Sequence, residues 1–117
     1  MPPTAEDRLH DIQESIAEIQ SILDGVTREQ FIAQRRLRLL TERLLEIVCE
    51  ASRRLPDHIK QSEPQIEWQK VVDFGNYLRH AYHSTRAEIV WDITQDDLPL
   101  LKAVTERHLS SRPEDRG

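Results

Sequence analysis

The fold class follows from residues 4–25, TAEDRLHDIQESIAEIQSILDG. Apolar residues return there every three or four positions, so they share one face of a helix. Thr4 is a suitable N-cap with Asp7 three residues further on, and Gly25 can take the left-handed conformation that ends a helix. The apolar residues of this stretch are Leu9, Ile12, Ile16, Ile19 and Leu23.

A second helix is predicted to begin after Thr27, which forms a capping box with Gln30. Its apolar positions run from Phe31 to Leu55, and Pro56 ends it. At 1.5 Å per residue such a helix is roughly 40 Å long. Residues 57–63 then read as a polar connection.

The rest of the chain predicts three further helices. Pro64 suits the first turn of a third helix over about residues 65–82. Ser84 and Thr85 can cap a short fourth helix, and Asp96 or Asp97 a fifth that has Pro99 in its first turn. We therefore expect an all-α fold: a four- to five-helix antiparallel bundle over residues 1–109, with most of its core from the first three helices, and a flexible tail over residues 110–117.

Composition limits the class of protein. The chain has 117 residues, a net charge of −5 and a pI of about 5.5, so it is long enough for one domain and more acidic than most nucleic-acid binders. The single cysteine, Cys49, lies in an apolar run and reads as a reduced core thiol. There is no apolar run of 18 residues and no signal peptide at the N-terminus, so we expect a cytoplasmic protein.

The predicted second helix is rich in arginine on its outer face. One interpretation is a solvated face on which the arginines pair with Glu42, Glu46 and Glu50. The other is a basic edge that follows RNA phosphates. The arginines are Arg35, Arg36, Arg38, Arg43, Arg53 and Arg54.

Candidate chemistry lies on the predicted third helix. At 100° per residue, four polar residues fall within about 80° of one another, opposite an apolar stripe of Val71, Phe74 and Leu78. The polar residues are Asp73, Asn76, His80 and His83.

Three uses of this polar stripe are open. Imidazole transfers protons well near neutral pH, as a metal-free RNase requires, and such an enzyme also needs a cation near the scissile phosphate. His80, His83 and Asp73 form a second option, a metal site, but no strong ligand motif supports it and we expect no metal and no cofactor. The third option is an ordinary pair of surface histidines.

Three segments resemble one known family. They are Asp73-Phe74-Gly75-Asn76-Tyr77-Leu78-Arg79-His80-Ala81-Tyr82, Ile89-Val90-Trp91-Asp92-Ile93 and Asp97-Leu98-Pro99-Leu100-Leu101. Together they resemble the C-terminal half of HepT-like proteins of the HEPN superfamily. The likeness is sharp over residues 68–101 and looser over the first two helices.

The resemblance implies a dimeric helical bundle that acts as a metal-independent RNase toxin of a bacterial, type VII-like toxin–antitoxin pair. It implies a minimal nucleotidyltransferase as antitoxin, which neutralises the toxin by adding AMP to the motif tyrosine. By position, His80 matches the catalytic histidine and Tyr82 the AMP acceptor, and Asn76 matches the polar residue after the motif arginine. Asp73 and His83 are accessory candidates. The RNA substrate is open, with transfer and messenger RNA both compatible.

One position departs from the family pattern. Gly75 stands where the motif arginine is expected, and Arg79 lies beside His80 instead. Either Arg79 supplies the cation, or nuclease activity is weakened or lost. The alternative functions are thus a catalytically degenerate module that only dimerises and binds its partner, and an unrelated helical adaptor.

Tyr82, the dimer interface and the two tryptophans give three further expectations. Tyr82 would lie about 160° from His80 on a continuous helix, so either the helix ends near Ala81, which we favour, or Tyr82 serves the other subunit's site. The alternative to the acceptor role is a core tyrosine that fills the apolar side. We expect the third helix at the homodimer interface, because a twofold axis there would double the polar stripe. Trp68 and Trp91 are predicted to be structural, with stacking on single-stranded RNA as the alternative.

Overall fold

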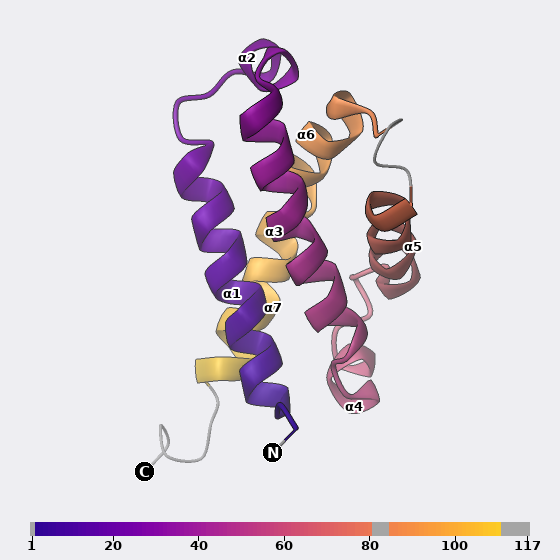
Figure 1. Cartoon of the computed structure of the whole chain (residues 1–117). Helices are drawn as coiled ribbons and strands as arrows, with labels where there is room; N and C mark the ends of the chain where they lie inside the picture. Colours follow the sequence, from indigo (N-terminus) through magenta and orange to yellow (C-terminus); the bar gives the residue numbers. More distant parts are fainter. Residues whose placement is uncertain (1, 81–84, 111–117) are drawn as a thin grey trace.

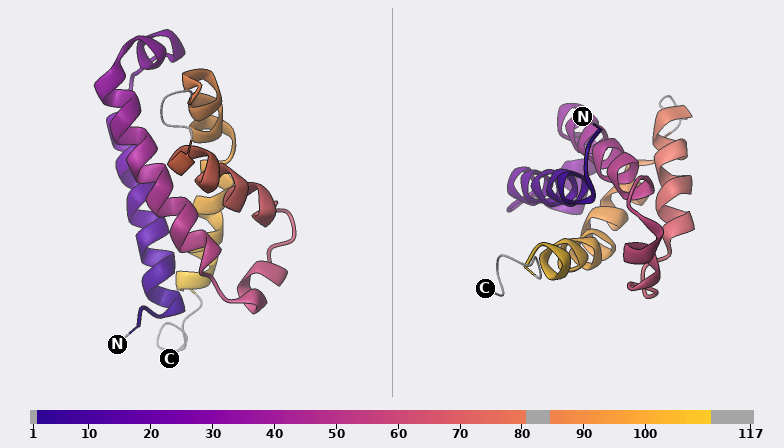
Figure 2. Two further views of the ribbon diagram at one scale, coloured as in Figure 1. Left: turned by 45° about the vertical axis from the view of Figure 1, so that its right-hand side comes forward. Right: turned by 90° about the horizontal axis from the view of Figure 1, so that it is seen from below.

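The computed structural model describes residues 2–80 and 85–110, which contain seven helices and no strand (Figure 1). The all-α prediction is confirmed. Helix α1 runs up the bundle and α3 and α7 run down it, so α1 is antiparallel to both, as expected, while α5 crosses α3 obliquely (Figures 1 and 2). The helices are α1 (Ala5–Ile22), α2 (Arg28–Ala33), α3 (Arg35–Arg53), α4 (Asp57–Gln61), α5 (Trp68–His80), α6 (Ala87–Asp96) and α7 (Leu98–Ser110).

Local signals set the start of the first two helices. The Thr4 hydroxyl accepts the Asp7 N–H at 3.1 Å, and the Asp7 carboxylate accepts the Thr4 N–H at 2.8 Å. The same reciprocal pair joins Thr27 and Gln30 at the start of α2. Gly25, with φ of 75°, ends the turn after α1 in the left-handed conformation. Both predicted capping boxes are confirmed.

The predicted 40 Å second helix is wrong, because it breaks at Gln34, whose backbone is extended (φ −105°, ψ 96°). The break lets α2 turn across the end of the bundle and buries Phe31 completely. There the Phe31 ring lies 5.5 Å from that of Trp91 on α6. A contact between residues so distant in sequence gives no periodic signal.

The polar connection over 57–63 also holds a short helix, α4, since Ile59 turns into the core and is 5% exposed. The next helix begins at Trp68 and not near residue 65. The Trp68 indole N–H lies 3.1 Å from the Lys60 carbonyl and 3.2 Å from the Glu63 carbonyl, which fixes the turns before α5. This contact supports the structural role predicted for Trp68.

The two C-terminal helices keep their predicted order with one change of cap. The N-cap of α6 is Arg86, not Ser84 or Thr85, and its backbone N–H donates to the Tyr77 hydroxyl at 2.8 Å. Helix α7 begins directly after Asp97, as predicted, and ends at Ser110. The tail beyond it lies outside the described residues.

The core lies between α1, α3 and α7, with α6 closing one end (Figure 2). The expectation that the first three predicted helices form most of the core is confirmed, although the third of them contributes little to it. Helix α7 packs along α1, whereas α5 lies against α3 on the outside and buries only Gly75 and Leu78. Among the described residues α5 packs mainly against α3, and Asp73, Asn76 and His80 on its other side are exposed.

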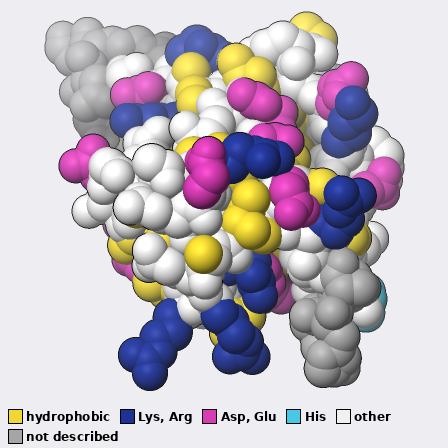
Figure 3. Space-filling view, turned by 90° about the horizontal axis from the view of Figure 1, so that it is seen from above, with side chains coloured by type: hydrophobic (Ala, Val, Ile, Leu, Met, Phe, Trp, Pro, Cys, Tyr) yellow, Lys and Arg dark blue, Asp and Glu magenta, His cyan; other side chains and the backbone are white. Residues whose placement is uncertain are grey.

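No helix among the described residues is long and apolar enough to cross a membrane. At the end of the bundle that carries α2, basic, acidic and hydrophobic side chains mix on the surface (Figure 3). Leu39 and Leu40, 42% and 45% exposed, lie near the start of α3.

Candidate active site

The polar stripe of α5 faces solvent, as its periodicity predicts. Asp73, Asn76 and His80 are exposed, while Leu78 is buried. Val71 and Phe74 are half-buried on the inner side. His83 and Tyr82 lie outside the described residues. The predicted end of the helix near Ala81 lies there too.

Gly75 marks the closest approach of α5 to α3. A Cβ placed there would lie 2.9 Å from the Cys49 Cβ, a distance that real Cβ atoms essentially never reach. Cys49 is 5% exposed, and burial raises the pKa of its thiol to about 12, so it is the inert core thiol that was predicted. No arginine fits at position 75 in this packing, so any phosphate cation must come from elsewhere.

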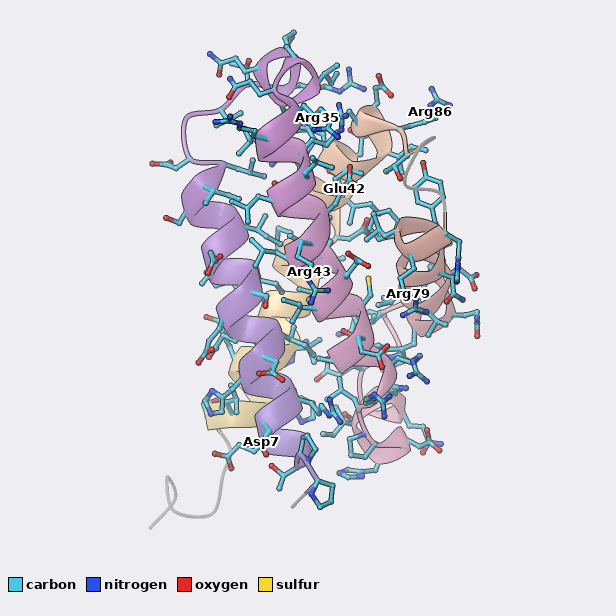
Figure 4. The ribbon with its side chains drawn as sticks, viewed as in Figure 1. Asp7, Arg35, Glu42, Arg43, Arg79 and Arg86 are labelled. Atoms are coloured by element: carbon cyan, nitrogen blue, oxygen red, sulfur yellow. The ribbon has the colours of Figure 1, made fainter. Side chains whose placement is uncertain are left out.

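Arg79 is the nearest candidate for that cation, and it is held by two neighbours. Its guanidinium donates to the Asn76 Oδ1 atom one turn back at 2.5 Å, and its other amino group lies 3.5 Å from the Glu50 Oε2 atom on α3. Figure 4 shows Arg79 on the side of α5 that faces α3. The Asn76 amide oxygen therefore bonds to Arg79 and not to His80, although Asn76 and His80 are four positions apart on one helix.

His80 lies at the end of α5 with its ring exposed. It makes no hydrogen bond or ion pair with any residue that the structure describes. An accessible imidazole without a competing partner is free to exchange a proton with a substrate.

Glu50 joins the two helices at this site, a role that sequence reasoning missed. It accepts from Arg53 at 2.8 and 3.2 Å and from Arg54 at 2.7 Å, in addition to the contact with Arg79. These hydrogen bonds, from Arg53 and then Arg54, lower the pKa of Glu50 to about 2. Its spacing to both arginines was visible in the sequence, but the link to Arg79 requires α5 to lie against α3.

Some of the other arginines of α3 pair with glutamates, as one interpretation of this face predicted, and others are left for the basic edge of the second interpretation. Arg38 lies 3.6 Å from Glu42, and Arg43 lies 4.0 Å from Glu46. Arg35 and Arg36 have no carboxylate partner among the described residues. Pairing thus covers most of this face without neutralising all of it.

Tyr77 also escaped the sequence analysis, because no motif marks it. Its ring stacks on Phe74 with 6.0 Å between centroids, and its hydroxyl accepts the Arg86 N–H. This bond ties the start of α6 to α5.

A cavity of about 380 Å³ lies behind the site, between α3, α5 and the α6–α7 corner. Its lining is mainly apolar and includes Val48, Phe74, Ile93 and Leu101, but none of Asn76, Arg79 and His80. Among residues 2–80 and 85–110, no group of three His, Cys, Asp or Glu side chains is placed to hold a metal ion. The exposed groups near Asn76 therefore offer proton transfer and anion binding.

Comparison with known proteins agrees with this geometry. The model of one family, described as Ribonuclease HepT-like, matches residues 12–108. This chain belongs to the HepT-like ribonuclease family.

Individual relatives of this family cover most of the chain. A protein of Thermococcus cleftensis named "Probable ribonuclease HepT" is 30% identical over 107 residues, which cover 92% of this chain and 97% of that protein. A protein of Methanocaldococcus jannaschii that carries the name of an RNase is 30% identical over 98 residues, covering 84% and 90%. No solved structure matches the chain significantly. The match runs through α3 and α5, the two helices that form the site.

Proposed function

We propose that this HepT-like chain is a metal-independent RNase that serves as the toxin of a type VII-like toxin–antitoxin pair. The observation that carries the proposal is the exposed His80, which has no hydrogen-bond partner among the described residues, beside Arg79, which Asn76 and Glu50 hold in place. RNA cleavage without metal requires a group that moves a proton and a cation at the phosphate. His80 supplies the first and Arg79 the second, in place of the arginine that Gly75 excludes.

The experiment is cleavage of RNA by purified protein in the presence of a chelator. His80→Ala should lower the rate by about 10²–10⁴, the usual contribution of a proton-transfer group, without unfolding the protein. The matched control is His58→Ala, since His58 is also exposed but lies on α4. Cleavage that survives in His80→Ala would refute the assignment.

Gly75 favours a second candidate function, because it removes the family's motif arginine. In that case the chain is a degenerate module that dimerises and binds its partner without cleaving RNA. Failure of the wild-type protein to cleave any RNA, together with retained binding to a nucleotidyltransferase, would establish this alternative.

We infer that a minimal nucleotidyltransferase is the antitoxin and that it adds AMP to Tyr82. Incubation with that enzyme and ATP should add AMP to the wild-type chain but not to Tyr82→Phe, as read by intact mass. Tyr77→Phe is the matched control, because the Tyr77 hydroxyl is occupied by the Arg86 N–H. Labelling that persists in Tyr82→Phe would move the acceptor elsewhere.

We further propose a homodimer across α5, the helix whose outer surface is open in this chain. A twofold axis there would bring two copies of His80 and Arg79 to one cleft. Light scattering at micromolar concentration should give twice the 13.7 kDa mass of one chain. A monomer under these conditions would contradict the proposal.

A further inference from the structure

The charge of this acidic chain is unevenly distributed. Residues 35–54 hold six arginines and three glutamates, a net of +3 (6 − 3), although the whole chain carries −5. The remaining residues therefore sum to −8 (−5 − 3). Helix α1, beside α3, has five acidic residues and one arginine, a net of −4 (1 − 5). Positive charge is concentrated on α3, the helix that supports the candidate active site.

The C-terminal end of this basic helix is built around one carboxylate. Glu50 gathers Arg53 and Arg54 from α3 and Arg79 from α5, so three positive charges surround one negative charge. Their side chains are 45%, 49% and 42% exposed, and Glu50 itself is 33% exposed. A guanidinium has five N–H donors, and Glu50 takes two from Arg53 and one each from Arg54 and Arg79. One more donor of Arg79 bonds to Asn76, and the other donors of the cluster make no hydrogen bond to a described residue.

Stability alone explains this cluster poorly. Exposed ion pairs between arginine and glutamate contribute little to folding. Arginine forks, by contrast, bind phosphate oxygens in a bidentate manner, and they do so better when their planes are already oriented. The cluster also includes Arg79, which directly precedes His80.

We propose that Arg53, Arg54 and Arg79 form a phosphate-binding clamp for the backbone of single-stranded RNA, and that Glu50 is the residue that positions it. This rests on the proposed RNase function, which it deepens by adding α3 to the substrate site. Arg53 and Arg54 bind phosphate groups beside the scissile one, and Arg79 binds the scissile phosphate itself, so the strand is directed to His80. Glu50 touches no substrate and acts by holding the three guanidinium groups in register.

The first test measures binding apart from cleavage. His80→Ala protein is titrated with a fluorescein-labelled oligouridylate at several salt concentrations. Adding Arg54→Gln or Arg53→Gln should weaken binding about fivefold at about 0.1 M salt and lower the salt slope by about 0.7, the loss of one phosphate contact to a single strand. Arg28→Gln on α2 makes the same charge change away from the site and should leave both values unchanged.

The second test separates the positioning role from charge. Glu50→Gln and Glu46→Gln each remove one negative charge from the outer face of α3, and each should bind RNA at least as tightly as the parent. Among the described residues Glu46 forms an ion pair with Arg43 alone, at 4.0 Å, so its variant should cleave normally. Glu50→Gln should lower the single-turnover cleavage rate at saturating RNA about tenfold, because Arg79 then keeps its bond to Asn76 but loses the charged partner that orients it toward α3. Equal cleavage by the two variants would overturn the role of Glu50.

The tests also distinguish failure of the clamp from failure of the nuclease. If the wild-type chain cleaves no RNA but the arginine variants lose binding, the clamp stands and the RNase function falls. If the chain cleaves RNA but Arg53→Gln and Arg54→Gln bind and cleave like the parent, the clamp falls. Normal RNA binding with weakened binding to a nucleotidyltransferase would assign this surface to a protein partner and overturn the proposal.

Discussion

Glu50 and Glu63 each accept hydrogen bonds from arginine, but the surroundings of the two carboxylates differ. Glu63, before α5, accepts from Arg107 at 2.5 and 3.2 Å and from Gln65 at 2.6 Å, with the His108 Nε2 atom 2.9 Å away. Its side chain is 7% exposed, while that of Glu50 is 33% exposed. In both cases hydrogen bonds from arginine lead the causes that lower the pKa to about 2.

The difference lies in what each carboxylate joins. Glu63 ties the turns before α5 to the end of α7, and both of its carboxylate oxygens contact Arg107. Glu50 joins α3 to α5 at the surface and leaves guanidinium donors open. Removing one partner from a buried ion pair is strongly destabilising, whereas an exposed pair contributes little stability and can bind an anion.

The largest expected effect on stability is that of Glu63→Gln. The substitution keeps the shape but removes the charge that Arg107 and His108 contact. We expect a loss of roughly 3 kcal/mol in the free energy of unfolding, the value of a pKa lowered from 4.5 to about 2. Urea unfolding should show a lower midpoint with an unchanged m-value. A change below about 1 kcal/mol would remove the contrast with Glu50, since that is the range of exposed pairs.

The same shift predicts a pH dependence. A carboxyl whose pKa is lower in the folded state stabilises the fold above the unfolded pKa, and this stabilisation is lost as pH falls through the folded pKa. For Glu63 the window runs from 4.5 down to about 2. The stability difference between wild type and Glu63→Gln should therefore shrink toward zero across this window in urea titrations. A difference that stays constant would mean that the carboxylate charge is not the cause.

A smaller effect is expected where α5 meets α3. Gly75→Ala forces a Cβ to within 2.9 Å of the Cys49 Cβ, so we expect a net loss of about 1 kcal/mol after the better helix propensity of alanine is counted. Cys49→Gly in the same chain should recover part of this loss, whereas Cys49→Ala, which keeps the Cβ, should not. Additive effects in both double variants would argue against a direct contact.

The smallest effect on stability is expected for Glu50→Gln. Its partners are exposed, so the free energy of unfolding, obtained from thermal unfolding, should fall by less than about 1 kcal/mol. The comparison with Glu63→Gln then becomes sharp, because the variant with the smaller stability loss has the larger loss in cleavage. If Glu50→Gln unfolds the protein as readily as Glu63→Gln, both carboxylates are structural.

Much of the fold could be predicted because its signals are local. The capping pairs at Thr4 and Thr27, the apolar periodicity of α1 and the polar face of α5 involve residues within a few turns of one another. The break at Gln34 could not be predicted, since its cause is the packing of Phe31 against Trp91, 60 positions away (91 − 31).

The candidate site divides in the same way. The sequence by itself determined that Asn76 and His80 share an exposed helical face, because helical geometry puts residues four apart on one side. Only the tertiary structure decided that Gly75 abuts Cys49 and that Glu50 reaches Arg79, since both contacts depend on how closely two helices approach. Helix periodicity states which way a side chain points, and the packing of one helix on another decides what it meets.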